Sequence, residues 1–270
     1  MSIGGNLEKI FSLRDKVILL TGAIGGIGSV LSKGMADVGA KMVLCDIDPA
    51  RLNELAAEIN KGGEGEAKAF PLDVLKMDSI KSCVDGVMKE YGRIDVLINC
   101  AGINKREGYL DVEEATYDKI MGVNLKGVYF LTQEVVKHMI KVKKGNIINF
   151  ASHNSVGMLG GVSVYGATKS AITALTRSMA VEWAKYNIRA NAIAPGHILT
   201  PLTTVTWEHP ERSKYLKERI AMGRPGLPEE ILGLTIMLAS DASSYMSGMM
   251  YHIDGGCLAG GQPWPFDTNY

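Results

Sequence analysis

Short apolar runs alternate with stretches of helical periodicity along most of the chain. Between Arg51 and Asn60, apolar side chains recur every three or four residues, which predicts a helix with one buried face. Ser79–Glu90 repeats this spacing with Ile80, Val84 and Val87. The apolar runs between such helices are the candidate strands, namely Lys16–Thr21, Lys41–Asp46, Ala67–Leu72, Ile94–Asn99, Asn146–Phe150, Ile188–Ala194 and Met250–Ile253.

Strands that are apolar along almost their whole length are typical of a sheet buried on both faces. Their alternation with helices predicts βαβ units, and hence a doubly wound parallel sheet of the α/β class. No linker or repeat interrupts the pattern, so we expect a single domain of the doubly wound Rossmann type over residues 1–270. Pro195–Pro228 carries five prolines and predicts a loop with one or two short helices, a typical lid.

The C-terminal tail, residues 257–270, contains three aromatic residues beyond the last predicted strand. They are Trp264, Phe266 and Tyr270. Aromatic side chains gain stability by burial, so we expect the tail to dock across a subunit interface.

Composition excludes several classes of function. The 270 residues include 29 Lys+Arg and 29 Asp+Glu, so the formal net charge is zero and the basic footprint of a nucleic-acid binder is missing. No apolar run is long enough to span a bilayer, and no secretory h-region is present near the start. The four cysteines form no Cys-x-x-Cys pair, so we expect free thiols, no metal site and a cytoplasmic location.

A glycine-rich turn follows the first predicted strand. It contains Gly22, Gly26 and Gly28, and a helical pattern begins there. A strand, a glycine turn and a helix N-terminus form a site for pyrophosphate, because backbone N–H groups and the helix dipole favour an anion. The spacing is Thr-Gly-x-x-x-Gly-x-Gly rather than Gly-x-Gly-x-x-Gly, and a plain tight turn would also explain the glycines.

Asp46 ends the second predicted strand, eighteen residues after Gly28. A carboxylate near this offset bonds the ribose hydroxyls of a dinucleotide, and its charge repels a 2′-phosphate. No Lys or Arg lies in the turn or directly after Asp46, which favours NAD over NADP. The other interpretation of Asp46 is a helix N-cap, a role that Asp48 before Pro49 could fill instead.

Tyr165 and Lys169 lie four residues apart at the start of a helical stretch, and so share one helix face. A tyrosine that acts as general acid/base near neutrality must have its pKa lowered from about 10, and a nearby ammonium favours the phenolate. Ser152 follows the strand Asn146–Phe150, and Asn99 ends another strand. Sites in parallel sheets form at such carboxyl ends.

Together these motifs resemble the classical short-chain dehydrogenase/reductase family, from about Leu13 to Gly256. The matching residues are Thr21-Gly22-x-x-x-Gly26-x-Gly28, Asp73-Val74, Asn99-Cys100-Ala101-Gly102, Asn124, Ser152, Tyr165-x-x-x-Lys169, and Pro195-Gly196 followed by Thr200. The resemblance implies a seven-stranded parallel sheet in the order 3-2-1-4-5-6-7. It also implies a homo-oligomer, with a tetramer favoured over a dimer.

The resemblance implies a catalytic set of Asn124, Ser152, Tyr165 and Lys169. The tyrosine would exchange a proton with the substrate oxygen, and the serine would hydrogen-bond that oxygen. The lysine would lower the tyrosine pKa and hold the nicotinamide ribose, while the asparagine would position a relay water.

The resemblance also implies the residues that contact the cofactor. The glycines would line the pyrophosphate, Asp46 would bind the adenine ribose and Asp73 the adenine ring, and Asn99 would support the cofactor strand. Thr200 and Ile198 would meet the carboxamide. The full implied set is Gly22, Gly26, Ile27, Gly28, Asp46, Asp73, Val74, Asn99, Ala101, Gly102, Tyr165, Lys169, Pro195, Gly196, Ile198 and Thr200. One departure is visible, since the family usually has asparagine where this chain has Cys100.

The substrate is less evident. The segment Ile103–Glu107 resembles that of gluconate 5-dehydrogenases and related sugar-acid dehydrogenases, and its Lys105 and Arg106 could pair with a carboxylate or be two solvated cations. Residues that flank the catalytic positions are polar, which suits a sugar or polyol. The candidate substrate residues are Lys105, Arg106, His153, Asn154, His197 and Trp207. Both histidines could instead serve only to satisfy backbone groups.

The sequence therefore predicts an NAD-dependent oxidoreductase that acts on a secondary alcohol of a sugar acid, sugar or polyol. A second candidate is a 3-oxoacyl-carrier-protein reductase, against which Asp46 and the lack of nearby basic residues count. A third is an NAD-binding scaffold without catalysis, which the intact set of four catalytic residues disfavours.

Overall fold

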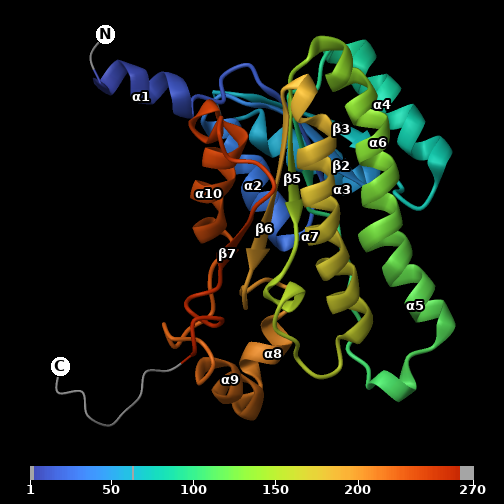
Figure 1. The fold of residues 1–270 in the computed structure, drawn as a ribbon, viewed down its shortest axis with the longest axis vertical. Helices are drawn as coiled ribbons and strands as arrows, with labels where there is room; N and C mark the ends of the chain where they lie inside the picture. Colours follow the sequence, from blue (N-terminus) through green and yellow to red (C-terminus); the bar gives the residue numbers. More distant parts are fainter. Residues whose placement is uncertain (1–2, 63, 262–270) are drawn as a thin grey trace.

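All seven predicted strands are present, and each boundary lies within two residues of its predicted position. The computed structural model describes residues 3–62 and 64–261, so the predicted docking of Trp264, Phe266 and Tyr270 lies outside the described residues. The strands form one parallel sheet in the order β3-β2-β1-β4-β5-β6-β7, as expected (Figure 1). Their bounds are β1 Val17–Thr21, β2 Lys41–Asp46, β3 Glu66–Pro71, β4 Val96–Asn99, β5 Gly145–Phe150, β6 Ile188–Pro195 and β7 Met250–Ile253.

Helices cover both faces of this sheet (Figure 1). Their bounds are α1 Ile3–Phe11, α2 Gly26–Asp37, α3 Pro49–Ile59, α4 Met77–Tyr91, α5 Glu114–Met121, α6 Val128–Val142, α7 Ser163–Trp183, α8 Thr204–Glu208, α9 Pro210–Lys217 and α10 Glu229–Ala239. One buried apolar cluster joins α2, α3 and α10 to the sheet, and a second joins α4, α6 and α7 to it. No helix in the described ranges is both long and apolar enough to cross a bilayer.

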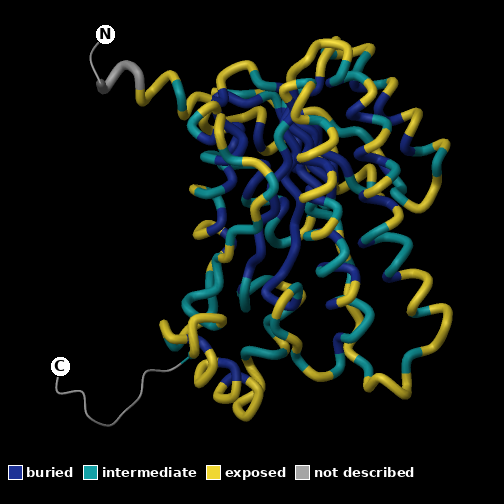
Figure 2. Tube along the Cα trace, viewed as in Figure 1, coloured by how far each residue is buried: buried dark blue, intermediate teal, exposed yellow. Residues whose placement is uncertain are grey.

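The helices on both faces of the sheet explain why the strands are apolar along their length. Along β1, Ile18 and Leu20 pack into one cluster, while Val17 and Leu19 pack into the other. Because successive side chains of a strand point to opposite faces, a strand between two helical layers must be apolar throughout. The central strands accordingly form the buried interior of the molecule (Figure 2).

Candidate active site

A cavity of about 870 Å³ lies at the carboxyl ends of the strands, within the range of a ligand site. It is lined by almost all of the candidate residues, namely Gly22, Gly26, Ile27, Gly28, Asp46, Asp73, Val74, Ala101, Gly102, Arg106, Ser152, His153, Asn154, Tyr165, Lys169, Pro195, Gly196, His197, Ile198, Thr200 and Trp207. Asn99, Lys105 and Asn124 do not line it. The fold thus gathers residues that are spread over most of the sequence.

The glycine turn is built for close backbone approach. Gly22 has a φ of 72°, and a Cβ there would lie 2.9 Å from Ala101 Cα. A Cβ on Gly28 would lie 2.0 Å from the Gly22 carbonyl oxygen. The Thr21 hydroxyl accepts hydrogen bonds from the N–H groups of Cys100 and Ala101, which ties the turn to the end of β4. The N-terminus of α2 faces the cavity, so this cradle fits a pyrophosphate.

Asp46 ends β2 at the cavity wall and accepts backbone hydrogen bonds from Ile47 and Ile24, at 2.8 and 3.4 Å. It does not cap a helix. Asp48 is the N-cap of α3, since its side chain accepts from the N–H groups of Ala50 and Arg51. The alternative interpretation of Asp46 as the helix cap is therefore wrong, and its carboxylate is directed to the cavity wall.

Arg51 is a cavity residue that the sequence analysis missed. Its guanidinium donates to the Ile24 carbonyl oxygen at 3.4 Å, across the glycine turn. The turn and the positions directly after Asp46 carry no basic residue, whereas Arg51 reaches the same place from the first turn of α3. A signal existed, because a long side chain at a helix N-terminus reaches back over the preceding loop.

Asp73 lines the cavity after β3, and both of its carboxylate oxygens already have local partners. Oδ1 accepts from the Leu75 N–H at 3.0 Å, and Oδ2 pairs with Lys76 Nζ at 3.2 Å. Asn99 is buried beneath the cavity, where its Nδ2 donates to Thr132 and Asn149. These bonds join β4, β5 and α6 and are consistent with a supporting role for Asn99.

Asn124 lies in a π-helical turn, Gly122–Gly127, between α5 and α6. Its Oδ1 accepts from the Ile103 N–H and its Nδ2 donates to the Ile103 carbonyl oxygen, both at 2.8 Å. The side chain thereby clamps the segment that follows β4. π-Helical turns interrupt a helix at some energetic cost and are found frequently at functional sites.

Tyr165, Lys169 and Ser152 meet at the cavity, as their spacing predicts. Lys169 is buried, its Nζ donates to the Phe150 carbonyl oxygen at 2.7 Å, and it lies 5.6 Å from the Tyr165 ring centroid. Burial lowers the pKa of Lys169 to about 8. Burial also raises the pKa of Tyr165, and a hydrogen bond with Ser152 only partly opposes this. In the protein chain alone, burial therefore outweighs the lowering expected from the lysine.

Two histidines and a tryptophan form a row along the substrate side of the cavity. The rings of His153 and His197 have centroids 4.5 Å apart, and those of His197 and Trp207 are 6.3 Å apart, edge to face. Burial lowers the pKa of His153. Burial, together with the neighbouring His153 and Arg106, lowers the pKa of His197 to about 4. Both rings are thus neutral at physiological pH.

Several polar atoms along this wall lack a partner. The structure gives no hydrogen bond to the buried atoms His153 Nε2, His197 Nε2 and Asn154 Oδ1 within the described residues. His153 Nδ1 contacts the Pro195 carbonyl oxygen at 3.4 Å, which favours the tautomer with the proton on Nδ1. Unsatisfied buried polar atoms cost free energy, so their concentration beside a cavity points to a polar ligand.

The two adjacent cations differ. Lys105 lies outside the cavity and forms an ion pair with Glu107, at 2.5 Å between Nζ and Oε1. Arg106 lines the cavity and has no hydrogen-bond or ion-pair partner among the described residues. Of the two candidates for binding a carboxylate, the structure brings only Arg106 to the site.

The segment from Pro195 to Pro228 forms the outer wall of the cavity, with α8 and α9 as its short helices (Figure 1). A bridge between Ile198 and Gly226 closes it at its base. A Cβ on Gly26 would lie 2.8 Å from Thr200 Cβ, so this wall rests directly against the glycine turn.

Comparison with known proteins shows the family to which the chain belongs. The family model described as "Enoyl-(Acyl carrier protein) reductase" matches residues 22–257. A 3-oxoacyl-[acyl-carrier-protein] reductase of Thermotoga maritima is 41% identical, over 91% of this chain and 99% of its own. A 2-dehydro-3-deoxy-D-gluconate 5-dehydrogenase of Escherichia coli is 38% identical, over 92% and 98%.

Solved structures agree with the relatives in sequence. A gluconate 5-dehydrogenase from Burkholderia cenocepacia, in complex with NADP and tartrate, superposes with a TM-score of 0.89 at 34% identity. The match covers 94% of this chain and 99% of that one. The chain therefore belongs to the classical short-chain dehydrogenase/reductase family of oxidoreductases.

Proposed function

We propose that the protein is an NAD-dependent oxidoreductase that interconverts a secondary alcohol and a ketone on a sugar acid or a related polyol. One observation carries this proposal. The serine–tyrosine–lysine group shares a cavity with Arg106, a cation without a partner among the described residues, and with a wall of neutral polar side chains. Relatives named for gluconate derivatives have the same fold and cover nearly the whole chain.

In the proposed reaction, Tyr165 exchanges a proton with the reacting oxygen of the substrate, and Ser152 hydrogen-bonds that oxygen. Lys169 stabilises the tyrosinate and holds the ribose next to it. Asn124 keeps Ile103 in place through its two hydrogen bonds. In the proposal it also positions a relay water. The nicotinamide, when bound, accepts or supplies the hydride. The role of the chain is to position the oxygen and move its proton.

The proposed cofactor site runs from Asp46 past the glycine turn to Ile198 and Thr200. NAD is the expected cofactor, because the Asp46 carboxylate disfavours a 2′-phosphate. Arg51 supplies an opposing charge at the cavity's adenosine end, so some use of NADP is expected as well. The Burkholderia relative was solved with NADP.

The proposed substrate carries its carboxylate at Arg106 and its hydroxyl groups along His153, Asn154 and His197. A guanidinium bonds a carboxylate with two parallel hydrogen bonds. With its proton on Nδ1, His153 accepts a hydrogen bond from a substrate hydroxyl at Nε2. Trp207 stands at the end of the row, edge to face with His197.

A 3-oxoacyl-carrier-protein reductase is the second candidate, and the Thermotoga relative of that name favours it. Such a substrate presents a long acyl chain and no free carboxylate beside the reacting carbon. An unpaired arginine and a histidine pair would then lack a function. The catalytically silent scaffold is the third candidate, and it would leave the gathered catalytic group unexplained.

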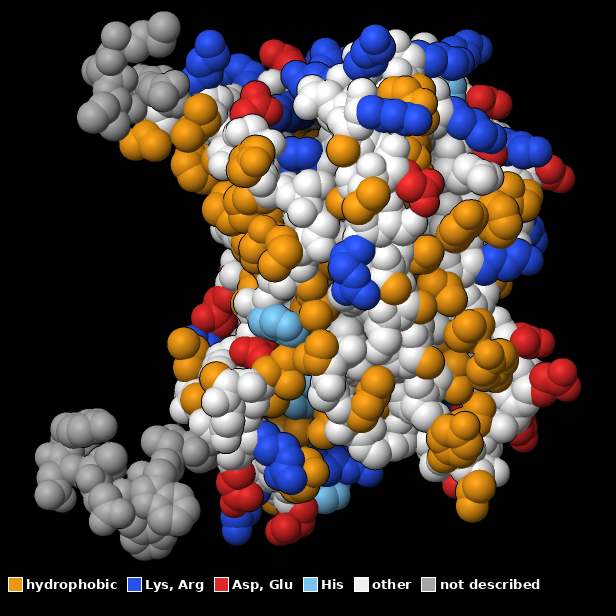
Figure 3. All heavy atoms as spheres, viewed as in Figure 1, with side chains coloured by type: hydrophobic (Ala, Val, Ile, Leu, Met, Phe, Trp, Pro, Cys, Tyr) orange, Lys and Arg blue, Asp and Glu red, His pale blue; other side chains and the backbone are white. Residues whose placement is uncertain are grey.

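We also expect a homo-oligomer, most simply a tetramer with two kinds of interface. Helix α10 is apolar on nearly all sides, and Leu234, Ile236 and Met237 are only partly buried, next to the edge strand β7. Figure 3 shows hydrophobic side chains gathered over this helix. A second exposed apolar group precedes α5, where Tyr109 and Leu110 are 82% and 97% exposed.

The decisive assay measures reduction of NAD⁺ and, in parallel, of NADP⁺ by the purified protein. Substrates are sugar acids such as gluconate, the neutral polyols of the same chain length, and simple secondary alcohols. Reduction of 3-oxoacyl thioesters tests the second candidate. Turnover of sugar acids with NAD⁺ supports the proposal, and Tyr165→Phe serves as the inactive control. Turnover of acyl thioesters alone would overturn it, and cofactor binding without any turnover would favour the scaffold.

A further inference from the structure

Two loops meet at the mouth of the cavity, residues 103–108 after β4 and residues 156–162 before α7. Their junction is a backbone hydrogen bond, in which the Glu107 N–H donates to the Gly161 carbonyl oxygen at 2.9 Å. On either side of this bond, Arg106, Leu159 and Val162 line the cavity. The position of Arg106 is therefore set by a contact between loops far apart in the sequence.

Two features of the structure exclude a side chain at position 161. Its φ is +79°, in the left-handed region where a side chain is strained. A Cβ at this position would lie 3.0 Å from Arg106 Cγ and 3.5 Å from the Glu107 carbonyl oxygen. The aliphatic stem of Arg106 thus occupies the space that a side chain at position 161 would take.

The ion pair between Lys105 and Glu107 completes the arrangement. Glu107 is mostly buried, with its side chain 16% exposed, and it is the acid nearest to Arg106 along the loop. Lys105 engages its Oε1 from the outer side. The Arg106 guanidinium stays without an acidic partner among the described residues and remains available to a ligand in the cavity.

We infer that Gly161 is a positioning residue for substrate recognition. Its missing side chain and its carbonyl oxygen hold the Arg106 stem against the loop before α7, so that the guanidinium reaches into the cavity toward a substrate carboxylate. Gly161 does not touch the substrate itself. This inference rests on the proposed function, in which Arg106 binds that carboxylate.

The test compares Gly161→Ala with Gly160→Ala in the full-length enzyme. Gly160 is the matched control, because a Cβ there would meet nothing within 4 Å and its φ is not in the left-handed region. Displacement of a binding group by a fraction of an ångström predicts an increase of about tenfold in the KM for the sugar acid in Gly161→Ala. The kcat and the KM for NAD⁺ should change less than about twofold, since neither depends on Arg106. Gly160→Ala should match the wild type.

A double-mutant cycle separates positioning from general damage to the fold. In the Arg106→Ala background, Gly161→Ala should raise the KM for the acid no further, because the two residues act as a unit. Gly161→Asn, whose side chain tolerates a positive φ but still carries a Cβ, should raise the KM as Gly161→Ala does. Equal increases in both backgrounds would overturn the inference.

The failure of the inference differs from failure of the proposed function. If Arg106→Ala raises the KM for the acid and Gly161→Ala does not, Gly161 is not a positioning residue and the proposed function stands. If Arg106→Ala leaves that KM unchanged, acid recognition by Arg106 is wrong and this inference is wrong with it.

Discussion

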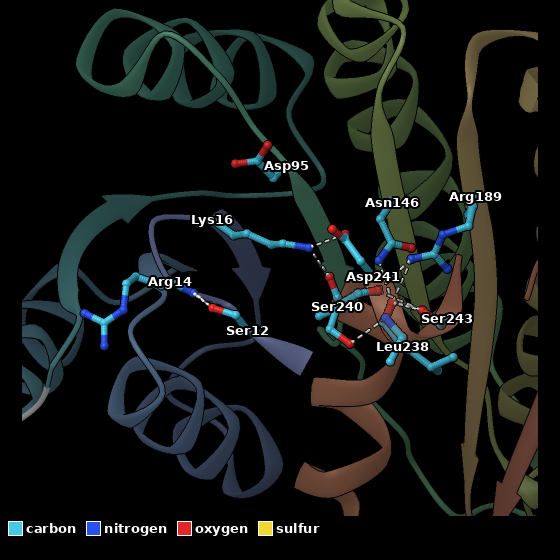
Figure 4. Close-up of polar contacts among 12 residues, drawn as sticks. Ser12, Arg14, Lys16, Asp95, Asn146, Arg189, Leu238, Ser240, Asp241 and Ser243 are labelled. Carbon is cyan, nitrogen blue, oxygen red and sulfur yellow. Dashed lines mark hydrogen bonds and ion pairs between the residues drawn. The ribbon is translucent and has the colours of Figure 1, made fainter. Parts of the chain in front are cut away.

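At the amino ends of the strands, Lys16, Asn146 and Arg189 direct their donor groups at the last carbonyl oxygens of α10 (Figure 4). At the carboxyl ends, His153, His197, Asn154 and Arg106 present polar groups without a partner among the described residues. The donor groups of the amino-end side chains are thus satisfied by backbone carbonyl oxygens, although Asn146 Oδ1 has no partner among the described residues, whereas the carboxyl-end groups face the cavity.

The amino-end cluster, formed by Lys16, Asn146 and Arg189, supplies hydrogen bonds to the C-terminal end of α10. The last carbonyl groups of a helix have no partner within it, and they carry its negative dipole end. Arg189 donates to the carbonyl oxygens of Leu238 and Ser240, both at 3.2 Å, and Asn146 donates to Leu238 at 2.6 Å. Lys16 donates to Ala239 at 3.3 Å. These cations and the amide hold α10 to the starts of β1, β5 and β6.

The comparison shows what distinguishes a structural polar cluster from a ligand site. Burial of a polar group costs free energy unless it is hydrogen-bonded. Where backbone carbonyl oxygens supply the bonds, the group contributes to stability. Where they do not, beside a cavity, a ligand is the expected partner. Variants at the two ends should therefore separate activity from stability.

The largest expected effect is on catalysis by Tyr165. Removal of its hydroxyl in Tyr165→Phe should lower kcat by about 10³-fold or more, because general acid/base catalysis is lost. The free energy of unfolding should stay near the wild-type value, as measured by denaturant titration. A variant with more than a tenth of the wild-type kcat would contradict the assignment of Tyr165.

Next comes the stability of the amino end. Arg189→Leu should lower the free energy of unfolding by about 3 kcal/mol, since it leaves carbonyl oxygens of Leu238, Ser240 and Met246 without this donor. The kcat and KM at 25 °C should be unchanged. An Arg189→Leu variant with normal stability and a raised KM would contradict the structural role of Arg189 at the amino ends of the strands.

Lys169 predicts a pH dependence of stability. Burial lowers its pKa to about 8 in the folded protein, whereas the unfolded value is near 10.4. Between these values the unfolded chain binds more protons than the folded one, so stability rises with pH. Relative to Lys169→Met, the wild type should gain about 2 kcal/mol in unfolding free energy between pH 8 and pH 10. A difference between the two proteins that is constant over this range would show that Lys169 is not held in a desolvated environment.

Arg106 and Lys105 provide the next contrast. Arg106→Ala should raise the KM for a sugar acid by about 10- to 30-fold, the effect of losing a charge-assisted contact of about 2 kcal/mol. Lys105→Ala should change it by less than about twofold, because the half-exposed Lys105 ammonium lies outside the cavity, where solvent screens its charge. Steady-state kinetics with both variants decide between them. The opposite ranking would restore Lys105 as the residue that binds the carboxylate.

The smallest expected effect concerns the cofactor. Asp46→Asn should raise the ratio of kcat/KM for NADP⁺ to that for NAD⁺ by about tenfold, since it removes the charge that opposes a 2′-phosphate. Arg51→Ala should lower the same ratio, because it removes the opposing cation at this end of the cavity. No change of the ratio in either variant would show that these two charges do not set the preference.

Much of the fold followed from the sequence, for a physical reason. A strand buried on both faces is apolar along its length and a helix on its surface is apolar on one side, so both leave periodic patterns. The glycine turn, Asp46 and the Tyr165–Lys169 spacing were equally local. Each could be recognised within a few residues.

Contacts between distant segments could not be predicted in this way. The local sequence offered Lys105 and Arg106 as equal candidates, and the contact with the distant Gly161 is what distinguishes Arg106. Arg51 was missed for the same reason. The pKa of Tyr165 was expected to fall because of its lysine neighbour, but burial, a property of the whole fold, dominates it.

One measurement tests the contrast between the two ends most directly, namely the thermal unfolding of wild type, Arg106→Ala and Arg189→Leu with NAD⁺ alone and with NAD⁺ plus a sugar acid. A ligand that binds only the folded state raises the Tm. We predict that the acid adds the same increment to the wild type and Arg189→Leu, although the latter starts from a lower Tm, and that Arg106→Ala responds to NAD⁺ but not to the acid. A normal response to the acid in Arg106→Ala, with its loss in Arg189→Leu, would contradict the account.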